Sequence, residues 1–272
     1  MGSGKFLYEG TIERLRTLEK LGVTFGAGYS RNRLRDPGNL LGAEAEVCVV
    51  ESLGPRVGYS TMRLSLATDG DVDVGFVYQA HRYGAQVKCF DLLDSSFGTR
   101  IISAGKQFDM DAIHAELGNF YFRRQFMGEE LANQNVQSIK GVHRKASIGI
   151  ETFEPDVFDL IKMRKAIYQR LNKALKQLDS VDSVRIVIFD IRRSQFSPVL
   201  LYNVVLALLG HFSPRYNALD CVAIIWYDLT AKDFQPNYDI YPICINIKNA
   251  GLIEKLNLNL SYPMYKVGVR WI

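Results

Sequence analysis

The stretch that decides the fold runs from residue 71 to residue 90 and reads DVDVGFVYQAHRYGAQVKCF. Apolar and polar residues alternate on both sides of the segment His81–Gly84, which is typical of two antiparallel strands joined by a short hairpin. We therefore expect one strand to begin near Asp73 and the next to contain Gln86 and Lys88. Since side chains alternate between the two faces of a strand, Gln86 and Lys88 should share one face.

Asp73 can reach that face across the strand ladder, so a carboxylate, an amide and an ammonium group should converge there. Mg²⁺ and Mn²⁺ prefer oxygen ligands, and Asp73 and Gln86 both supply them. We expect these two residues to be the metal ligands, with the backbone carbonyl of Val87 as a third oxygen. Lys88 would then orient a water or stabilise negative charge that develops on a phosphate group. The pattern favours metal-assisted cleavage of a phosphodiester bond.

A helix is predicted upstream of these strands, ending at Gly54-Pro55. Glu46 precedes Val49, Val50 and Leu53 at spacings of three, four and seven residues, so this glutamate should lie beside the buried stripe of the helix. We expect Glu46 to complete the metal site through a water. Glu44 is the second choice, because the residues at the same three spacings from it are Val47, Cys48 and the polar Glu51.

These residues resemble the signature of the PD-(D/E)XK nucleases, which share the restriction-endonuclease-like fold. That signature is a helix glutamate, an aspartate that opens a strand, and Glu-x-Lys on the next strand. Glu46, Asp73 and Gln86-Val87-Lys88 occupy these places, and the glutamine is similar to the Gln-x-Lys variant of Mrr-type restriction enzymes. The resemblance covers residues 40–92, with weaker support from residues 181–230. It implies Glu46, Asp73, Gln86 and Lys88 as catalytic residues, Mg²⁺ (or Mn²⁺) as cofactor, and DNA as substrate.

The rest of the chain predicts an α/β protein. Further elements are expected as helices over 11–22, 155–178 and 198–209 and as strands over 59–68, 184–191 and 222–227. The last two strands are almost continuously apolar, which favours a parallel or mixed sheet covered on both faces. We expect a restriction-endonuclease-like mixed central sheet flanked by helices, with a large insertion and a β-rich C-terminal extension.

A chain of 272 residues is long enough for one elaborated domain, and we expect a single domain over residues 1–272. Its predicted parts are an N-terminal helix and loop (1–39), a nuclease-like core (40–92 and 181–230), an insertion (93–180) and the β-rich extension (231–272).

Basic residues outside the motif are candidates for contact with nucleic acid. Arg31, Arg33 and Arg35 are spaced two apart in a loop rich in glycine, and loops can adapt to a phosphate backbone. His81 and Arg82 belong to the predicted hairpin, which we expect to border the site. The basic face of the helix over 156–178 is interpreted as a solvated face, with contact to DNA as the alternative. The net charge of +4 fits a polyanionic partner without requiring one.

Composition is that of an ordinary globular protein, with 47% hydrophobic and 23% charged residues. The four cysteines are scattered and lack the spacing of a zinc site, so we expect buried thiols in a reducing compartment. No apolar run approaches the ~20 residues of a membrane span, and the N-terminus has no hydrophobic signal region. We expect a cytoplasmic protein with no membrane partner, and a homo-oligomer is left open.

Three functions are therefore considered. The first is a metal-dependent endonuclease that hydrolyses DNA, in restriction, defence or repair. The second is a catalytically inactive nucleic-acid-binding or assembly subunit that retains a nuclease-like fold. The third is a structural or interaction protein in which the Asp73 strand and the Gln86 strand form an ordinary solvated hairpin.

Overall fold

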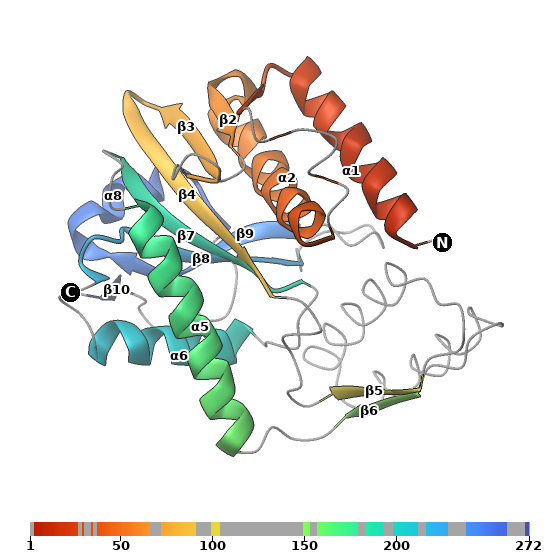
Figure 1. The fold of residues 1–272 in the computed structure, drawn as a ribbon. Helices are drawn as coiled ribbons and strands as arrows, with labels where there is room; N and C mark the ends of the chain where they lie inside the picture. Colours follow the sequence, from red (N-terminus) through yellow and green to blue (C-terminus); the bar gives the residue numbers. More distant parts are fainter. Residues whose placement is uncertain are drawn as a thin grey trace.

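An eight-stranded mixed sheet forms the centre of the computed structural model, with strand order β1-β2-β3-β4-β7-β8-β9-β10 (Figure 1). The structure describes residues 3–26, 29, 34, 37–65, 72–90, 99–103, 149–152, 157–178, 183–192, 198–211, 216–227, 238–259 and 270–271. The strands of the central sheet are β1 (Thr24–Phe25), β2 (Met62–Leu64), β3 (Val74–Tyr78), β4 (His81–Cys89), β7 (Val184–Asp190), β8 (Cys221–Tyr227), β9 (Tyr238–Asn246) and β10 (Arg270–Trp271). A separate pair consists of β5 (Thr99–Ser103) and β6 (Gly149–Thr152).

The helices are α1 (Ser3–Lys20), α2 (Pro37–Val57), α5 (Val157–Leu178), α6 (Pro198–His211) and α8 (Ala250–Glu254), with 3₁₀ turns over Tyr59–Thr61 and Ile247–Asn249. In the sheet, β2, β3 and β4 form an antiparallel meander, and β4, β7 and β8 run parallel to one another. The expectation of a mixed sheet flanked by helices is confirmed.

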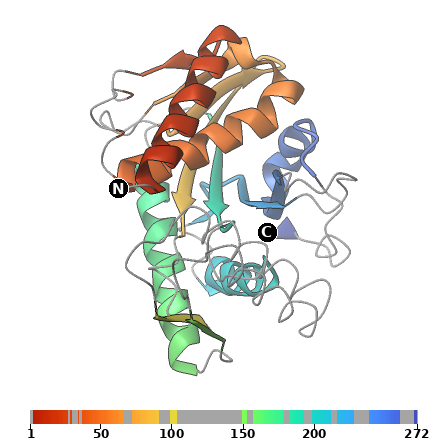
Figure 2. The ribbon, with the colours of Figure 1, turned by 90° about the vertical axis from the view of Figure 1, so that its right-hand side faces the viewer.

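Helices cover both faces of this sheet, and each face has its own apolar core (Figure 2). α1 and α2 pack on one face, where they meet Ile186 and Ile188 of β7. α5 and α6 pack on the other face against Val187 and Phe189 of the same strand. Both sets of β7 side chains are buried, which explains why this strand reads as a continuous apolar run.

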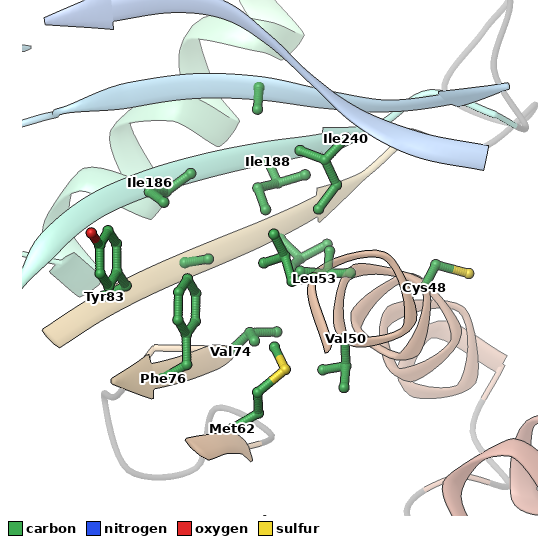
Figure 3. Close-up of a cluster of buried hydrophobic side chains, with 14 of the residues drawn as sticks. Cys48, Val50, Leu53, Met62, Val74, Phe76, Tyr83, Ile186, Ile188 and Ile240 are labelled. Carbon is green, nitrogen blue, oxygen red and sulfur yellow. The ribbon is translucent and has the colours of Figure 1, made fainter. Parts of the chain in front are cut away.

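Figure 3 shows the core between α2 and the sheet, into which Val50 and Leu53 of the helix project. Phe76 of β3 and Tyr83 of β4 stack with ring centroids 4.8 Å apart. These two residues are direct cross-strand partners, so their stacking fixes the register of the hairpin. That register in turn decides which residues of β4 face Asp73.

α5 is the crossover helix between the parallel strands β4 and β7, which need such a connection. Its buried residues, among them Ile167 and Leu171, belong to the core that contains Phe189. The helix lies within residues 93–180, which the sequence pattern assigned to an insertion. Its packing shows that α5 covers one face of the central sheet and belongs to the core of the fold.

The hairpin turn lies two residues earlier than expected. Gln79 and Ala80 are the central residues, with φ of 47° and 64°, which is the pattern of a type I′ turn. The segment His81–Gly84 is the first half of β4 and not a turn. The prediction was wrong because Gln79-Ala80 lacks the glycine or asparagine that usually marks such a turn.

α2 also extends past its expected end at Gly54-Pro55, by one turn, to Val57. Gly54 is needed for packing, because a Cβ atom there would lie 2.1 Å from the ring of Tyr59. The amide of Gly58 donates to the carbonyl of Gly54 at 2.9 Å, and Gly58 ends the helix with a φ of 94°.

The C-terminal extension is only partly β-structured in the described residues. β9 agrees with the prediction, but residues 247–254 form the 3₁₀ turn and α8, and residues 255–257 form a turn where a strand was expected. Within the part of the chain that is described, we find no helix with the length and apolar character needed to cross a membrane.

Candidate nuclease-like site

Asp73, Gln86 and Lys88 converge where β3 begins, near the end of β4. Asp73 directly precedes β3, and Val74 pairs with Ala85, so the antiparallel register places Asp73 beside Gln86. The Asp73 Oδ2 atom accepts a hydrogen bond from the backbone amide of Val87 at 2.8 Å. This bond fixes the aspartate against the strand that carries the other two side chains.

The Lys88 ammonium group contacts three side-chain oxygens. Its Nζ lies 2.6 Å from Gln86 Oε1, 3.4 Å from Asp73 Oδ2 and 3.0 Å from Gln177 Oε1. A lysine has three N–H donors, so these contacts can use all of them. The aspartate and glutamine oxygens therefore meet at one ammonium group, on the face of β4 that Gln86 and Lys88 were expected to share.

Glu46 of α2 interacts electrostatically with Asp73 and Lys88. It is buried, and its Oε2 accepts a hydrogen bond from the hydroxyl group of Tyr29. Burial raises the pKa of Glu46 well above its ordinary value, and the neighbouring Asp73 charge raises it further. Glu46 and Asp73 are thus close enough to repel each other.

Asp73 shows the same tendency. Burial raises the pKa of Asp73, while Lys88 and the amide of Val87 act in the opposite direction. Two buried carboxyl groups thus share the nearby positive charge of Lys88. This pair of carboxyl groups favours the binding of an additional cation, because a second positive charge would allow both carboxyl groups to ionise.

Glu44, the second choice for the helix glutamate, belongs to a different cluster. Its Oε2 accepts a hydrogen bond from Arg192 Nη2 at 2.9 Å, and its Oε1 accepts one from Arg14 Nη1 at 3.2 Å. Two positions along a helix correspond to about 200° of rotation, so Glu44 and Glu46 face opposite ways. The geometry thus brings Glu46, and not Glu44, to Asp73.

The cluster around Glu44 is a network of ion pairs and hydrogen bonds that connects Arg14 of α1, Glu44 of α2, Asp190 of β7 and Tyr238 of β9. Arg192 also pairs with Asp190, with contacts of 2.9 and 2.7 Å. Burial opposes the charge on Arg192, but the acidic neighbours outweigh it and raise the arginine's pKa. Burial also raises the pKa of the adjacent Cys48 thiol to about 12, so this thiol stays protonated.

The predicted contacts to nucleic acid do not gather at this site. Arg31, Arg33 and Arg35 lie outside the described residues. His81 and Arg82 are exposed, but they lie at the opposite end of β4 from Lys88, about 20–23 Å away at ~3.3 Å per residue. There they line a hollow of about 390 Å³ together with Asp220. The expectation that their hairpin borders the site is wrong, because the turn is at the far end of the strands.

Three residues near the site were not identified from the sequence. Gln177 and Lys173 come from α5, and Lys173 acts on Asp73 by lowering its pKa, against the effect of burial. Tyr29 comes from the loop in which only the arginines were considered. None of the three belongs to a recognisable sequence motif, and only the tertiary fold brings each of them close to Asp73 or Glu46.

The described residues contain no group of three or more His, Cys, Asp or Glu side chains that could hold a metal ion. The site instead offers the carboxylates of Asp73 and Glu46 and the amide oxygen of Gln86. Mg²⁺ is commonly held by one or two carboxylates, with waters and substrate phosphates completing its six ligands. The donor set is thus too sparse for a closed metal cage, so waters and substrate oxygens would have to complete the ligands of a metal ion there.

Comparisons with known proteins do not identify the chain: no family model, no curated protein and no solved structure matches it.

Proposed function

We propose that this protein is a Mg²⁺-dependent deoxyribonuclease that cleaves phosphodiester bonds at Asp73, Gln86 and Lys88. The observation that carries the proposal is the contact of a single ammonium group with both the Asp73 carboxylate and the Gln86 amide oxygen. Glu46 is a second acidic group that interacts with Asp73. An acid, a neutral oxygen ligand and a lysine in this arrangement suit charge stabilisation at a phosphate group.

The topology supports the same proposal. The order α2-β2-β3-β4-α5-β7, with an antiparallel meander followed by a parallel strand, is compatible with the αβββαβ core of the PD-(D/E)XK nucleases. Glu46 lies on the helix of this order, Asp73 directly precedes the second strand, and Lys88 lies on the third strand. A restriction-endonuclease-like fold is therefore part of the proposal.

The roles of the side chains follow from their positions. Asp73 and Gln86 would hold the metal ion directly, and Glu46 would contact it through a water. When bound, Mg²⁺ would supply positive charge that polarises the phosphate and lowers the pKa of a nearby water. Lys88 orients the attacking water and stabilises the phosphate oxygens as they gain charge. The new bond forms between the water oxygen and phosphorus, the bond to the 3′ oxygen breaks, and that oxygen gains a proton.

Gln177 has a distinct role in this arrangement. If Asp73 and Gln86 turn their oxygens toward the metal ion, Lys88 loses two of its three acceptors. The contact with Gln177 Oε1 at 3.0 Å then remains to keep the ammonium group in the site. The other two N–H groups become available to water and phosphate.

A second candidate is a catalytically inactive subunit that binds nucleic acid or serves assembly and retains this fold. The contacts of Lys88 favour this candidate, because the ammonium group already donates hydrogen bonds to the Asp73 and Gln86 oxygens that would bind the metal ion. In such a protein Lys88 would take the place of the cation permanently. The neutral Gln86, in place of a glutamate, also weakens the attraction for metal.

Cleavage of supercoiled plasmid in the presence of Mg²⁺ or Mn²⁺ distinguishes the two candidates. Asp73→Asn and Lys88→Met approximately keep the shapes of these side chains, and both should abolish cleavage. Glu19→Gln and Lys255→Met change charge by the same amounts at exposed positions and should cut like the parent. EDTA should stop all cleavage. Cutting that survives in Asp73→Asn would reject the site, and DNA binding without cutting would favour the inactive subunit.

A further inference from the structure

The exposed face of α5 is strongly basic. Between Ile161 and Leu178 the helix contains six basic residues and no acidic residue. Its residues Ile167, Leu171, Leu175 and Leu178 are buried against the sheet. Ile161 is exposed, as are the basic residues Arg164, Lys165, Lys173 and Lys176. A helix that only needs a solvated face usually mixes both signs of charge, because pairs of opposite charge stabilise it.

This face leads directly to the candidate site. Gln177 contacts Lys88 at 3.0 Å, and Lys173 lies one turn earlier on the same side of the helix, about 6 Å along the axis. Farther along, the guanidinium group of Arg170 lies 4.3 Å from the centre of the Phe90 ring, just beyond the end of β4. Figures 1 and 2 both show that the N-terminal half of α5 continues beyond this end of the strand.

Two hollows follow the same face. The first, of about 340 Å³, is lined by Tyr168, Gln169, Asn172, Lys173 and Lys176. The second, of about 270 Å³, is lined by Ile161, Arg164, Lys165, Tyr168 and Leu208. Because Tyr168 lines both, they adjoin. The described residues that line them offer hydrogen-bond donors and positive charges, and no carboxylate is among these described residues.

The helix dipole explains only part of this charge. Basic side chains in the last turn of a helix are favoured by the partial negative charge there, which accounts for Lys176. The effect falls off within one turn. Arg164 and Lys165 lie three turns or more before the end of α5, so the dipole does not account for them.

We propose that this face of α5 binds the phosphate backbone of one DNA strand, which runs from the candidate site toward the N-terminal end of the helix. The identity of the strand rests on the proposed function, because it is the strand that would be cut beside Asp73. Phosphates on one strand follow one another every ~3.4 Å of duplex axis, so the ~6 Å from Gln177 to Lys173 spans one or two nucleotides. Lys173 and Lys176 would hold the phosphates next to the scissile one, and Lys165 would meet the strand farther on.

The test measures binding of a fluorescein-labelled 30-base-pair duplex by anisotropy in EDTA, so that no cleavage occurs. Titrations between about 50 and 300 mM NaCl give the slope of log K against log salt concentration. Lys173→Ala with Lys176→Ala should reduce the magnitude of this slope by about 2, since each lost phosphate contact removes ~0.9. The matched control is Lys248→Ala with Lys255→Ala, two exposed lysines on the C-terminal segment around α8.

An unchanged slope for the control pair and a reduced slope for the α5 pair support the proposal. Equal effects of the two pairs, or no binding by the parent protein at ~50 mM NaCl, overturn it. The proposed function fails separately. If DNA binding depends on the α5 lysines but no metal-dependent cleavage occurs, the proposed nuclease activity is contradicted and the proposed DNA-binding face stands. If metal-dependent cleavage occurs but DNA binding does not depend on these lysines, the nuclease activity stands and the DNA-binding face is contradicted.

Discussion

Replacing Lys88 with methionine should make the protein bind Mg²⁺ more tightly while it loses the ability to cut DNA. Methionine keeps the apolar stem of the side chain and removes the ammonium group, which contacts Gln86 at 2.6 Å and Asp73 at 3.4 Å. These two oxygens are the proposed metal ligands, so Lys88 and the metal ion compete for them. The substitution also removes a positive charge that repels the cation.

The size of the effect follows from the contacts. A hydrogen bond to a charged group contributes about 1.5–3 kcal/mol, so removing the competition should tighten Mg²⁺ binding roughly 10- to 100-fold. Without metal, Asp73 loses its cationic partner in a buried site, which should cost on the order of 2–4 kcal/mol of folding free energy. For a protein of this size that corresponds to a fall in Tm of roughly 4–15 °C.

Isothermal titration calorimetry measures the affinity for Mg²⁺. Thermal unfolding without Mg²⁺ measures the fall in Tm, and thermal unfolding with Mg²⁺ measures how much of that fall is recovered. Lys255→Met, at an exposed position, is the control and should match the parent in both assays. If Lys88→Met binds Mg²⁺ no more tightly than the parent does, Asp73 and Gln86 are not the ligands. If the variant still cuts DNA at the parent rate, Lys88 has no role in the chemistry.

Gln86→Glu should also tighten Mg²⁺ binding, since it adds a negative charge to the ligand set, and an unchanged calorimetric titration would show that Gln86 is not a ligand. Arg192→Met should lower the free energy of unfolding by about 3–5 kcal/mol because it leaves the charges of its buried partners unpaired; Arg16→Met, at an exposed site, should change it by less than ~0.5 kcal/mol. A loss for Arg192→Met as small as that of the control would contradict the buried network. Since the pKa of Glu46 is raised in the folded protein, the folded state binds more protons, and metal-free stability should fall as pH rises from the ordinary value of 4.5 toward the raised one. Chemical denaturation should therefore show Glu46→Gln gaining stability over the parent across this range, and a constant difference between the two would count against a buried ionising Glu46.

The local arrangement of the site could be predicted because strands and helices have fixed periods. Alternation along β4 places Gln86 and Lys88 on one face, and the antiparallel register brings Asp73 next to them. The spacing of apolar residues after Glu46 predicted which glutamate of α2 faces the sheet. Burial does not separate the two glutamates, because Glu44 and Glu46 are both 4% exposed. Their partners do: Glu46 accepts a hydrogen bond from Tyr29, whereas Glu44 accepts one from Arg192.

The remaining contacts depend on tertiary structure that no local pattern reveals. Gln177 lies 89 residues beyond Lys88, and the long segment between β4 and α5 concealed that α5 is the crossover helix of the sheet. Tyr29 reaches Glu46 from a loop without a regular period. The turn at Gln79-Ala80 was missed for a different reason, since neither residue type usually adopts positive φ.

The central claim is that Asp73 and Gln86 bind one divalent cation beside Lys88, and anomalous scattering from a crystal grown with Mn²⁺ tests it most directly. We expect one strong peak within about 2.0–2.3 Å of an Asp73 carboxylate oxygen and the Gln86 amide oxygen, with Lys88 still held by Gln177. Asp73→Asn crystals grown in the same way should lose this peak. Parent crystals with no peak between Asp73 and Gln86 at about 10 mM Mn²⁺, or with Mn²⁺ bound only elsewhere, would contradict the claim.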